Sequence, residues 1–170
     1  MQASRRILRI LQLALYLPKI AYFDIAIRPM MPGYEFWRKW LIADSVLILF
    51  VGAFLISMSA HPDPAADPFT SLFWKDGISD GAGMFYAWAF GVWGATLAGW
   101  ATTLMFIAVY PLKKKEAWAF YSIGLSIAIW YPLDTFISFY FGVLLNCALN
   151  TVLLVLVVVP LLAMRRDLKR

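Results

Sequence analysis

The chain has 170 residues, of which 62% are hydrophobic and 15% charged, and its mean hydropathy is +0.73. A soluble domain is usually about 45–50% apolar and about 25% charged, and a domain of this size still exposes roughly a third of its unfolded surface. The composition therefore excludes a soluble globule, a disordered tail and a secreted disulfide scaffold. It predicts an all-α integral membrane protein whose first partner is the lipid bilayer.

The net charge of +5 would suggest a nucleic-acid partner if the protein were soluble. The basic residues, however, flank long apolar runs, where they set the orientation of membrane helices. We therefore expect no nucleic-acid binding.

Residues 1–39 form a segment that precedes the long apolar runs. Polar side chains recur there at helical steps of four and three, at Arg5, Arg9, Gln12, Tyr16 and Lys19, and the other residues of 7–17 are apolar. A helix with this pattern is suited to lie in the cytoplasmic headgroup region or against another subunit. A cleavable signal peptide is the competing interpretation, but Arg9 interrupts its apolar run and no small-residue cleavage motif follows.

Four apolar runs are long enough to cross a bilayer, which takes about 20 helical residues. They cover residues 40–60, 84–110, 117–141 and 143–164. Each must be helical, because an open strand would leave backbone polar groups unpaired in lipid. Residues 40–170 are therefore predicted to form one domain, a four-transmembrane-helix bundle.

The outer loop, residues 61–83, mixes prolines and glycines with large apolar residues such as Leu72 and Trp74. This composition favours a short helix or turn on the outer membrane surface over a solvated linker. A calcium loop at residues 76–81 is the alternative, but it lacks the usual ligand spacing and the distal glutamate.

Fourteen of the 15 lysines and arginines lie before the first run, between the second and third, or after the fourth, and Lys75 alone lies on the opposite side. The positive-inside rule then places both the N- and C-termini in the cytoplasm of an inner (plasma) membrane protein. Lys113, Lys114 and Lys115 could also bind anionic lipid headgroups, although the topology signal requires no such role.

Asp44 lies near the predicted start of the first span. There we expect its carboxylate to reach water or to cap the helix before Ser45.

Small residues recur every four positions in the second span, at Ala87, Gly91, Ala95, Gly99 and Thr103, and Gly94 and Ala98 widen this stripe. Small side chains let a neighbouring helix approach closely in lipid. The stripe therefore predicts a helix contact, either within the bundle or with a second copy or another membrane subunit.

Asp134 lies inside the third span, where an ionised carboxylate costs about 2.5–3.5 kcal/mol. It follows the inner end of its span by about 17 residues, a depth in the outer leaflet, and the fourth span begins at comparable depth. We expect a polar cluster of Asp134, Thr135, Ser138, Asn146 and Asn150. This cluster either locks the two helices together or lines an outward-facing cavity that binds a proton, a cation or a ligand headgroup. Pro132 predicts a kink nearby.

No catalytic or metal-binding motif stands out in the chain. No span holds paired acidic residues, and HExxH, GxSxG and glycine-rich phosphate loops are missing from the sequence. Cys147 and His61 are the single cysteine and histidine, and they lie in an apolar run and a polar loop respectively. We therefore predict no intrachain disulfide, no metal site, no cofactor and no catalytic residues.

Three runs carry a resemblance to known sequences: GVWGATLAGW at 91–100, YPLKKKEAW at 110–118 and WYPLDTFIS at 130–138. Over residues 69–160, including Gly142, Asn146 and Asn150, the chain resembles a group of small bacterial inner-membrane proteins. The resemblance implies four membrane helices and brings no assigned activity.

Two functions follow from these patterns, and a membrane enzyme comes third because the sequence shows no catalytic motif. The first is a non-enzymatic membrane protein that acts by helix packing, as an accessory or assembly subunit or a homo-oligomer. The alternative is a small-molecule or lipid-binding protein, with transport as one form, that uses the cluster around Asp134.

Overall fold

The computed structural model describes residues 33–60, 68–73 and 82–168. The chain divides into two units, Met1–Gly33 and Tyr34–Arg170, and every helix described below belongs to the second. Three predictions therefore fall outside the described residues: most of the amphipathic segment at 1–39 with its signal-peptide alternative, the calcium alternative at 76–81, and the side of the membrane occupied by Lys75.

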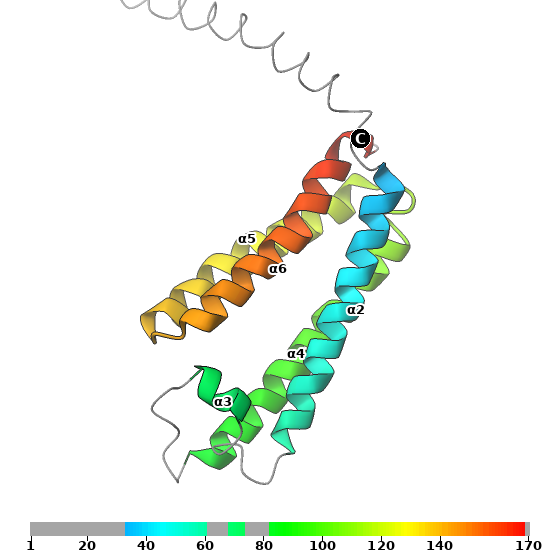
Figure 1. The fold of residues 1–170 in the computed structure, drawn as a ribbon. Helices are drawn as coiled ribbons and strands as arrows, with labels where there is room; N and C mark the ends of the chain where they lie inside the picture. The colour runs from blue at the N-terminus through cyan, green and yellow to red at the C-terminus, as the bar shows by residue number, and fades with distance from the viewer. Residues whose placement is uncertain (1–32, 61–67, 74–81, 169–170) are drawn as a thin grey trace, which may run out of the picture. The chain divides into compact units, whose positions relative to one another are not determined.

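The second unit contains four long helices, which are α2 (Tyr34–Ser59), α4 (Gly83–Val109), α5 (Ala117–Tyr140) and α6 (Leu144–Met164) (Figure 1). A short helix, α3 (Pro68–Phe73), precedes α4, and a 3₁₀ turn, η2 (Arg165–Asp167), follows α6. All four long helices are long and apolar enough to cross a membrane. The all-α class with four candidate spans is therefore confirmed, and α3 supplies the short helix expected in the outer loop.

Large apolar side chains are exposed along all four long helices, among them Phe50, Phe106, Phe136 and Leu162. A helix that is hydrophobic on every side is either buried in a large protein or surrounded by lipid. Because the unit is too small to bury these faces, its outer surface is suited to a hydrocarbon environment.

Helix α2 begins six residues earlier than predicted, at Tyr34. Hydropathy alone leaves the charged residues before position 40 in the interfacial segment that precedes the span, but the side chains of Glu35 and Arg38 make contacts within the helical region. Arg38 pairs with Glu35 at 2.7 Å and donates a hydrogen bond from Nη1 to the backbone oxygen of Ala108 at 3.3 Å. A long cationic side chain near a helix end can reach polar groups in this way.

The early start of α2 corrects the prediction for Asp44. Asp44 lies about three turns inside the helix, so it cannot cap it. Its side chain is 6% exposed, and its Oδ2 atom has no hydrogen-bond partner among the described residues. Asp44 is therefore an interior residue of α2, because the helix begins at Tyr34 and not at residue 40 as the local hydropathy predicts.

Helices α2 and α4 pack antiparallel along a regular seam (Figure 1). Apart from Asp44, the buried positions alternate in steps of three and four on both helices. They are Tyr34, Arg38, Leu41, Ser45, Ile48, Gly52 and Leu55 on α2, and Phe90, Gly94, Ala101, Leu104 and Ala108 on α4, with a partly buried Leu97 between Gly94 and Ala101. A mean step of 3.5 is typical of left-handed coiled-coil packing. At the closest approach, a Cβ added to Gly94 would lie 2.5 Å from the backbone oxygen of Gly52.

The α2–α4 seam uses only part of the predicted small-residue stripe. Gly91 lies beside Ser59, whereas Ala95, Gly99 and Thr103 are exposed and a Cβ added to Gly99 would meet nothing within 4 Å. Positions four apart turn about 40° further round a helix of 3.6 residues per turn at each step. The stripe therefore winds away from α2, while the steps of three and four stay on it.

Helices α5 and α6 form a second antiparallel pair, joined at Gly142, whose φ of 75° lies in the left-handed region that favours glycine. Pro132 and Pro160 lie within continuous helices. Because Pro160 has no N–H, the carbonyl of Leu156 loses its partner four residues ahead. The indole of Trp40 donates a hydrogen bond to that carbonyl at 3.2 Å, which ties α2 to α6.

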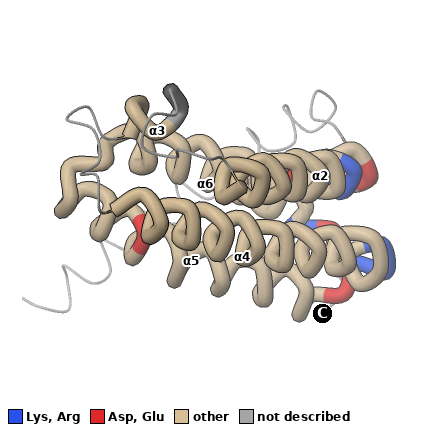
Figure 2. Tube along the Cα trace, turned by 90° about the horizontal axis from the view of Figure 1, so that it is seen from below, with Lys and Arg blue, Asp and Glu red and all other residues tan. Residues whose placement is uncertain are grey.

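Every lysine and arginine in the described ranges lies at one end of the second unit (Figure 2). The turn between α4 and α5 meets the start of α2 there: Tyr34 donates a hydrogen bond to the backbone oxygen of Leu112 at 2.5 Å, and the Nζ atom of Lys115 lies 5.0 Å from the Tyr34 ring. Lys113 and Lys114 are exposed beside them. This end carries the positive charge expected on a single side of the membrane.

Candidate functional site

The predicted polar cluster forms between α5 and α6. Three donors converge on Oδ1 of Asp134: Nδ2 of Asn150 at 2.6 Å, Nδ2 of Asn146 at 2.8 Å and Oγ of Ser138 at 3.2 Å. Thr135 joins through its Oγ1, which accepts from Nδ2 of Asn150 at 3.5 Å. The structure thus brings together all five residues of the cluster.

The turn at Gly142 explains why these residues meet. Asp134 and Asn150 are each eight residues from Gly142, and Ser138 and Asn146 are each four residues from it. In an antiparallel pair, residues equally far from the turn lie at the same depth, and residues four apart share one face of a helix. The tight turn therefore places two polar layers opposite each other.

The amide donors of the cluster are fully used. Each Asn side chain has two N–H donors. Asn146 directs its pair to Asp134 and to Oγ of Ser138, the latter at 2.7 Å, and Asn150 directs its pair to Asp134 and Thr135. No donor from the described ranges reaches Oδ2 of Asp134 or the side-chain oxygens of the two asparagines. The unused capacity of the Asp134 carboxylate and of both amides therefore consists of acceptors.

A cavity of about 230 Å³ adjoins the cluster. It lies between the α2–α4 pair and the α5–α6 pair, and each of the five described α-helices contributes to its lining. Asp134, Asn146 and Asn150 are its polar residues, and the remaining walls are aliphatic or aromatic. The cavity therefore combines an apolar body with one polar end.

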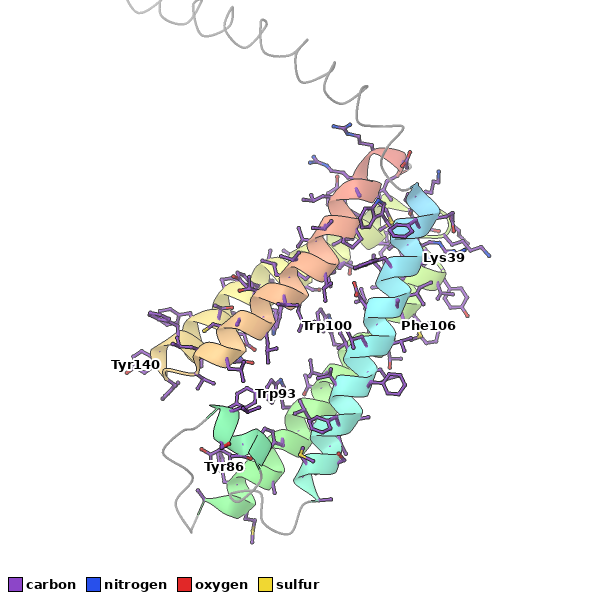
Figure 3. The ribbon with its side chains drawn as sticks, in the orientation of Figure 1. Lys39, Tyr86, Trp93, Trp100, Phe106 and Tyr140 are labelled. Carbon is purple, nitrogen blue, oxygen red and sulfur yellow. The ribbon has the colours of Figure 1, made fainter. Side chains whose placement is uncertain are left out.

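Aromatic side chains shape this cavity. Trp93 and Trp100 project from α4 toward α5 and α6 (Figure 3), and Trp93 lines the cavity together with Trp130. The Trp100 and Trp130 rings lie 5.6 Å apart. Helix α3 adds Phe73, which makes an edge-to-face contact with Trp93 at 6.5 Å. The outer loop thus contributes directly to the site.

The cavity is accessible from the outer surface of the helices. Leu47 and Val51 on α2 and Leu149 and Val152 on α6 line it, yet each is at least 43% exposed. These residues border an opening between the two helical pairs. If lipid surrounds the helices, an apolar molecule can enter from the hydrocarbon region.

Sequence reasoning missed the aromatic half of the site. Trp130 is four residues before Asp134 and shares its helix face, so the spacing contained a usable signal. Trp93 and Phe73 belong to distant segments and carried no such signal.

The other candidate groups add no ligating or catalytic side chain to the cluster in the described parts of the chain. Among the described residues, no group of three or more His, Cys, Asp or Glu side chains could hold a metal ion. Cys147 is half-buried on α6, 3.6 Å from the backbone oxygen of Thr135. Lys113, Lys114 and Lys115 lie at the charged end of the unit (Figure 2), and a role in binding headgroups stays a prediction.

No family model, curated protein or solved structure matches the chain. The resemblance to small bacterial inner-membrane proteins therefore stays a prediction.

Proposed function

We propose that this protein is a multi-pass membrane protein that binds a small apolar or amphipathic molecule between its two helical pairs. The observation that carries the proposal is the cavity of about 230 Å³, apolar over most of its wall and polar at Asp134, Asn146 and Asn150. Ligand sites are typically apolar with a few placed polar groups. An apolar cavity of about 150 Å³ is already large enough for benzene.

In this proposal α2, α4, α5 and α6 cross the inner membrane. The charged end of the unit faces the cytoplasm, and the N- and C-termini lie on the same side, by the positive-inside rule. Asp134 then lies in the outer half of the bilayer. A ligand would reach it laterally, through the opening bordered by Val51 and Val152.

The unused acceptors favour ligand binding over a purely structural cluster. A cluster that only joined α5 to α6 would satisfy its polar atoms internally, because unpaired polar groups are costly in lipid. Here Asp134, Asn146 and Asn150 line the cavity and keep acceptor atoms that no described residue uses. A bound molecule can supply the missing donor.

Two valines on α6 provide a matched test. Val152 and Val155 are 55% and 52% exposed, and only Val152 lines the cavity. We expect the wild type and Val155→Trp to retain a noncovalently bound small molecule in native mass spectrometry from mild detergent, and Val152→Trp to lose it. A wild-type protein without bound molecules, or equal occupancy in both variants, would overturn the proposal.

A second candidate function is that of an accessory subunit or homo-oligomer. It is favoured by the outward position of Ala95, Gly99 and Thr103, which leaves a small-residue face on α4 without a neighbour in the described unit. Replacing Gly99 with Leu should then remove a copurifying subunit or shift the particle mass to that of one chain. An unchanged mass would contradict this candidate.

A further inference from the structure

We infer that the ligand of this cavity is an organic cation, with an apolar body in the cavity and a positively charged head at Asp134. This inference rests on the proposed function and names its ligand class. Three observations on the site carry it: the hydrogen-bond capacity left over, the charge left over, and the nature of the walls.

The first observation is that the cluster offers acceptors and a negative charge to a ligand. The side-chain N–H groups of Asn146 and Asn150 already donate hydrogen bonds to Asp134, Ser138 and Thr135. Oδ2 of Asp134 and the two asparagine oxygens receive no hydrogen bond from any described donor. A head that brings only acceptors, such as a carboxylate or phosphate, would meet like-charged oxygen and unmatched lone pairs. A donor-bearing or cationic head is complementary.

The second observation is that Asp134 has no cationic partner in the described parts of the chain. Arg38 pairs with Glu35 and not with Asp134. The described lysines and arginines lie at one end of the unit (Figure 2), where α5 begins, and Asp134 lies in the last third of α5. An intramembrane carboxylate normally faces a partner or a cavity, and this one has the cavity. A cationic ligand would supply the missing counter-charge.

The third observation concerns the walls. Trp93, Trp130 and Phe73 line the same cavity, and indole faces attract cations as well as apolar groups. Beyond Asp134, Asn146 and Asn150 the lining is aliphatic or aromatic, so it cannot complete the set of about six or more oxygen ligands that a calcium or magnesium ion requires. The combination fits an organic ammonium with an apolar body better than a hydrated metal ion.

A pair of isosteric probes separates charge from shape. Benzyltrimethylammonium carries a permanent charge, and neopentylbenzene has the same shape without it. Binding of each is measured by equilibrium dialysis against nanodiscs that contain the full chain, with protein-free nanodiscs correcting for partition into lipid. Asp134→Asn is the matched variant, because the amide keeps an oxygen for the three donors and removes the charge.

We expect the wild type to bind the cation at least about tenfold more tightly than neopentylbenzene, and Asp134→Asn to lose that preference. If both probes bind the wild type equally, the cation inference is overturned while the proposed ligand site survives. A preference that persists in Asp134→Asn overturns the cation inference in the same way. If neither probe binds, the inference fails, and the mass-spectrometric comparison of Val152→Trp with Val155→Trp decides the proposed function separately. The comparison of probes on the wild type needs no variant to fold.

Discussion

Adding one methyl group at Gly94 tests whether the α2–α4 seam holds the first helical pair together. A Cβ at this position would lie 2.5 Å from the backbone oxygen of Gly52, and 2.8 Å from the backbone nitrogen of Ile56. Both obstacles are backbone atoms, so no side-chain rotation relieves the contact. Gly94→Ala must therefore push the two helices apart.

The control is Gly99→Ala on the same helix, where an added Cβ meets nothing within 4 Å. Both substitutions gain about the same helix propensity, up to about 1 kcal/mol, so this gain cancels in their difference. What remains is the overpacking at Gly94, which typically costs about 1–3 kcal/mol. We expect Gly94→Ala to be less stable than Gly99→Ala by that amount.

Steric trapping in bicelles measures the free energy of unfolding of both variants under the same conditions. Separation of α2 from α4 can be followed in parallel by the distance between labels at exposed sites on the two helices. A difference below about 0.5 kcal/mol, which is the size of ordinary surface effects, would refute the close glycine contact and with it the register of the seam.

Three further predictions concern the second pair and the orientation. Trp40→Phe should lower the free energy of unfolding by about 1–2 kcal/mol, because the carbonyl of Leu156 loses its donor. The loss should be much smaller in a Pro160→Ala background, where the restored N–H of residue 160 bonds to the same carbonyl. Equal losses in the two backgrounds of this double-mutant cycle would contradict the proposed link between Trp40 and Pro160. Asp134→Leu should destabilise the α5–α6 pair by about 2 kcal/mol in thermal unfolding, because three donors lose their acceptor. Asp134→Asn should destabilise the pair by clearly less, because the amide keeps an acceptor oxygen. Equal effects of the two substitutions would show that these hydrogen bonds contribute little to stability. In a Cys147→Ser background, a cysteine at Lys114 should react with a membrane-impermeant maleimide only from the cytoplasmic side, and a cysteine at Leu72 only from the outer side; labelling of both from one side would overturn the topology.

The polar cluster is predictable from the sequence because it depends on local spacing. Gly142 marks the turn, and residues at equal distances from it must meet if the two helices are continuous and antiparallel. The apolar runs predict the helix ends to within a few residues for the same reason, since the length of a span is set by the bilayer. Only the start of α2 differs from its predicted position by more than one residue. There Arg38 contacts Glu35 and the backbone of Ala108, which a hydropathy pattern cannot show.

The cavity is not predictable in this way, because it depends on how two helical pairs diverge. Its lining comes from five helices, including Phe73 in a loop that the sequence describes only by composition. The role of Trp40 is similarly non-local, since its acceptor is released by a proline 120 positions away. The small-residue stripe shows a second limit of sequence patterns. Residues spaced by four and residues spaced by a mean of 3.5 lie on the same helix face over two turns, but over five turns they lie on different faces.

Photo-crosslinking in living cells tests the central claim, that the cavity holds a specific small molecule in the membrane. A compact aliphatic diazirine amino acid, close in size to leucine so that the cavity stays open, is placed at Leu149, which lines the cavity, and in a second protein at Val155, which does not. We predict that intact-mass analysis finds one dominant adduct at Leu149 and the mixed masses of bulk phospholipids at Val155. The same mixture of lipid adducts at both positions would contradict the account.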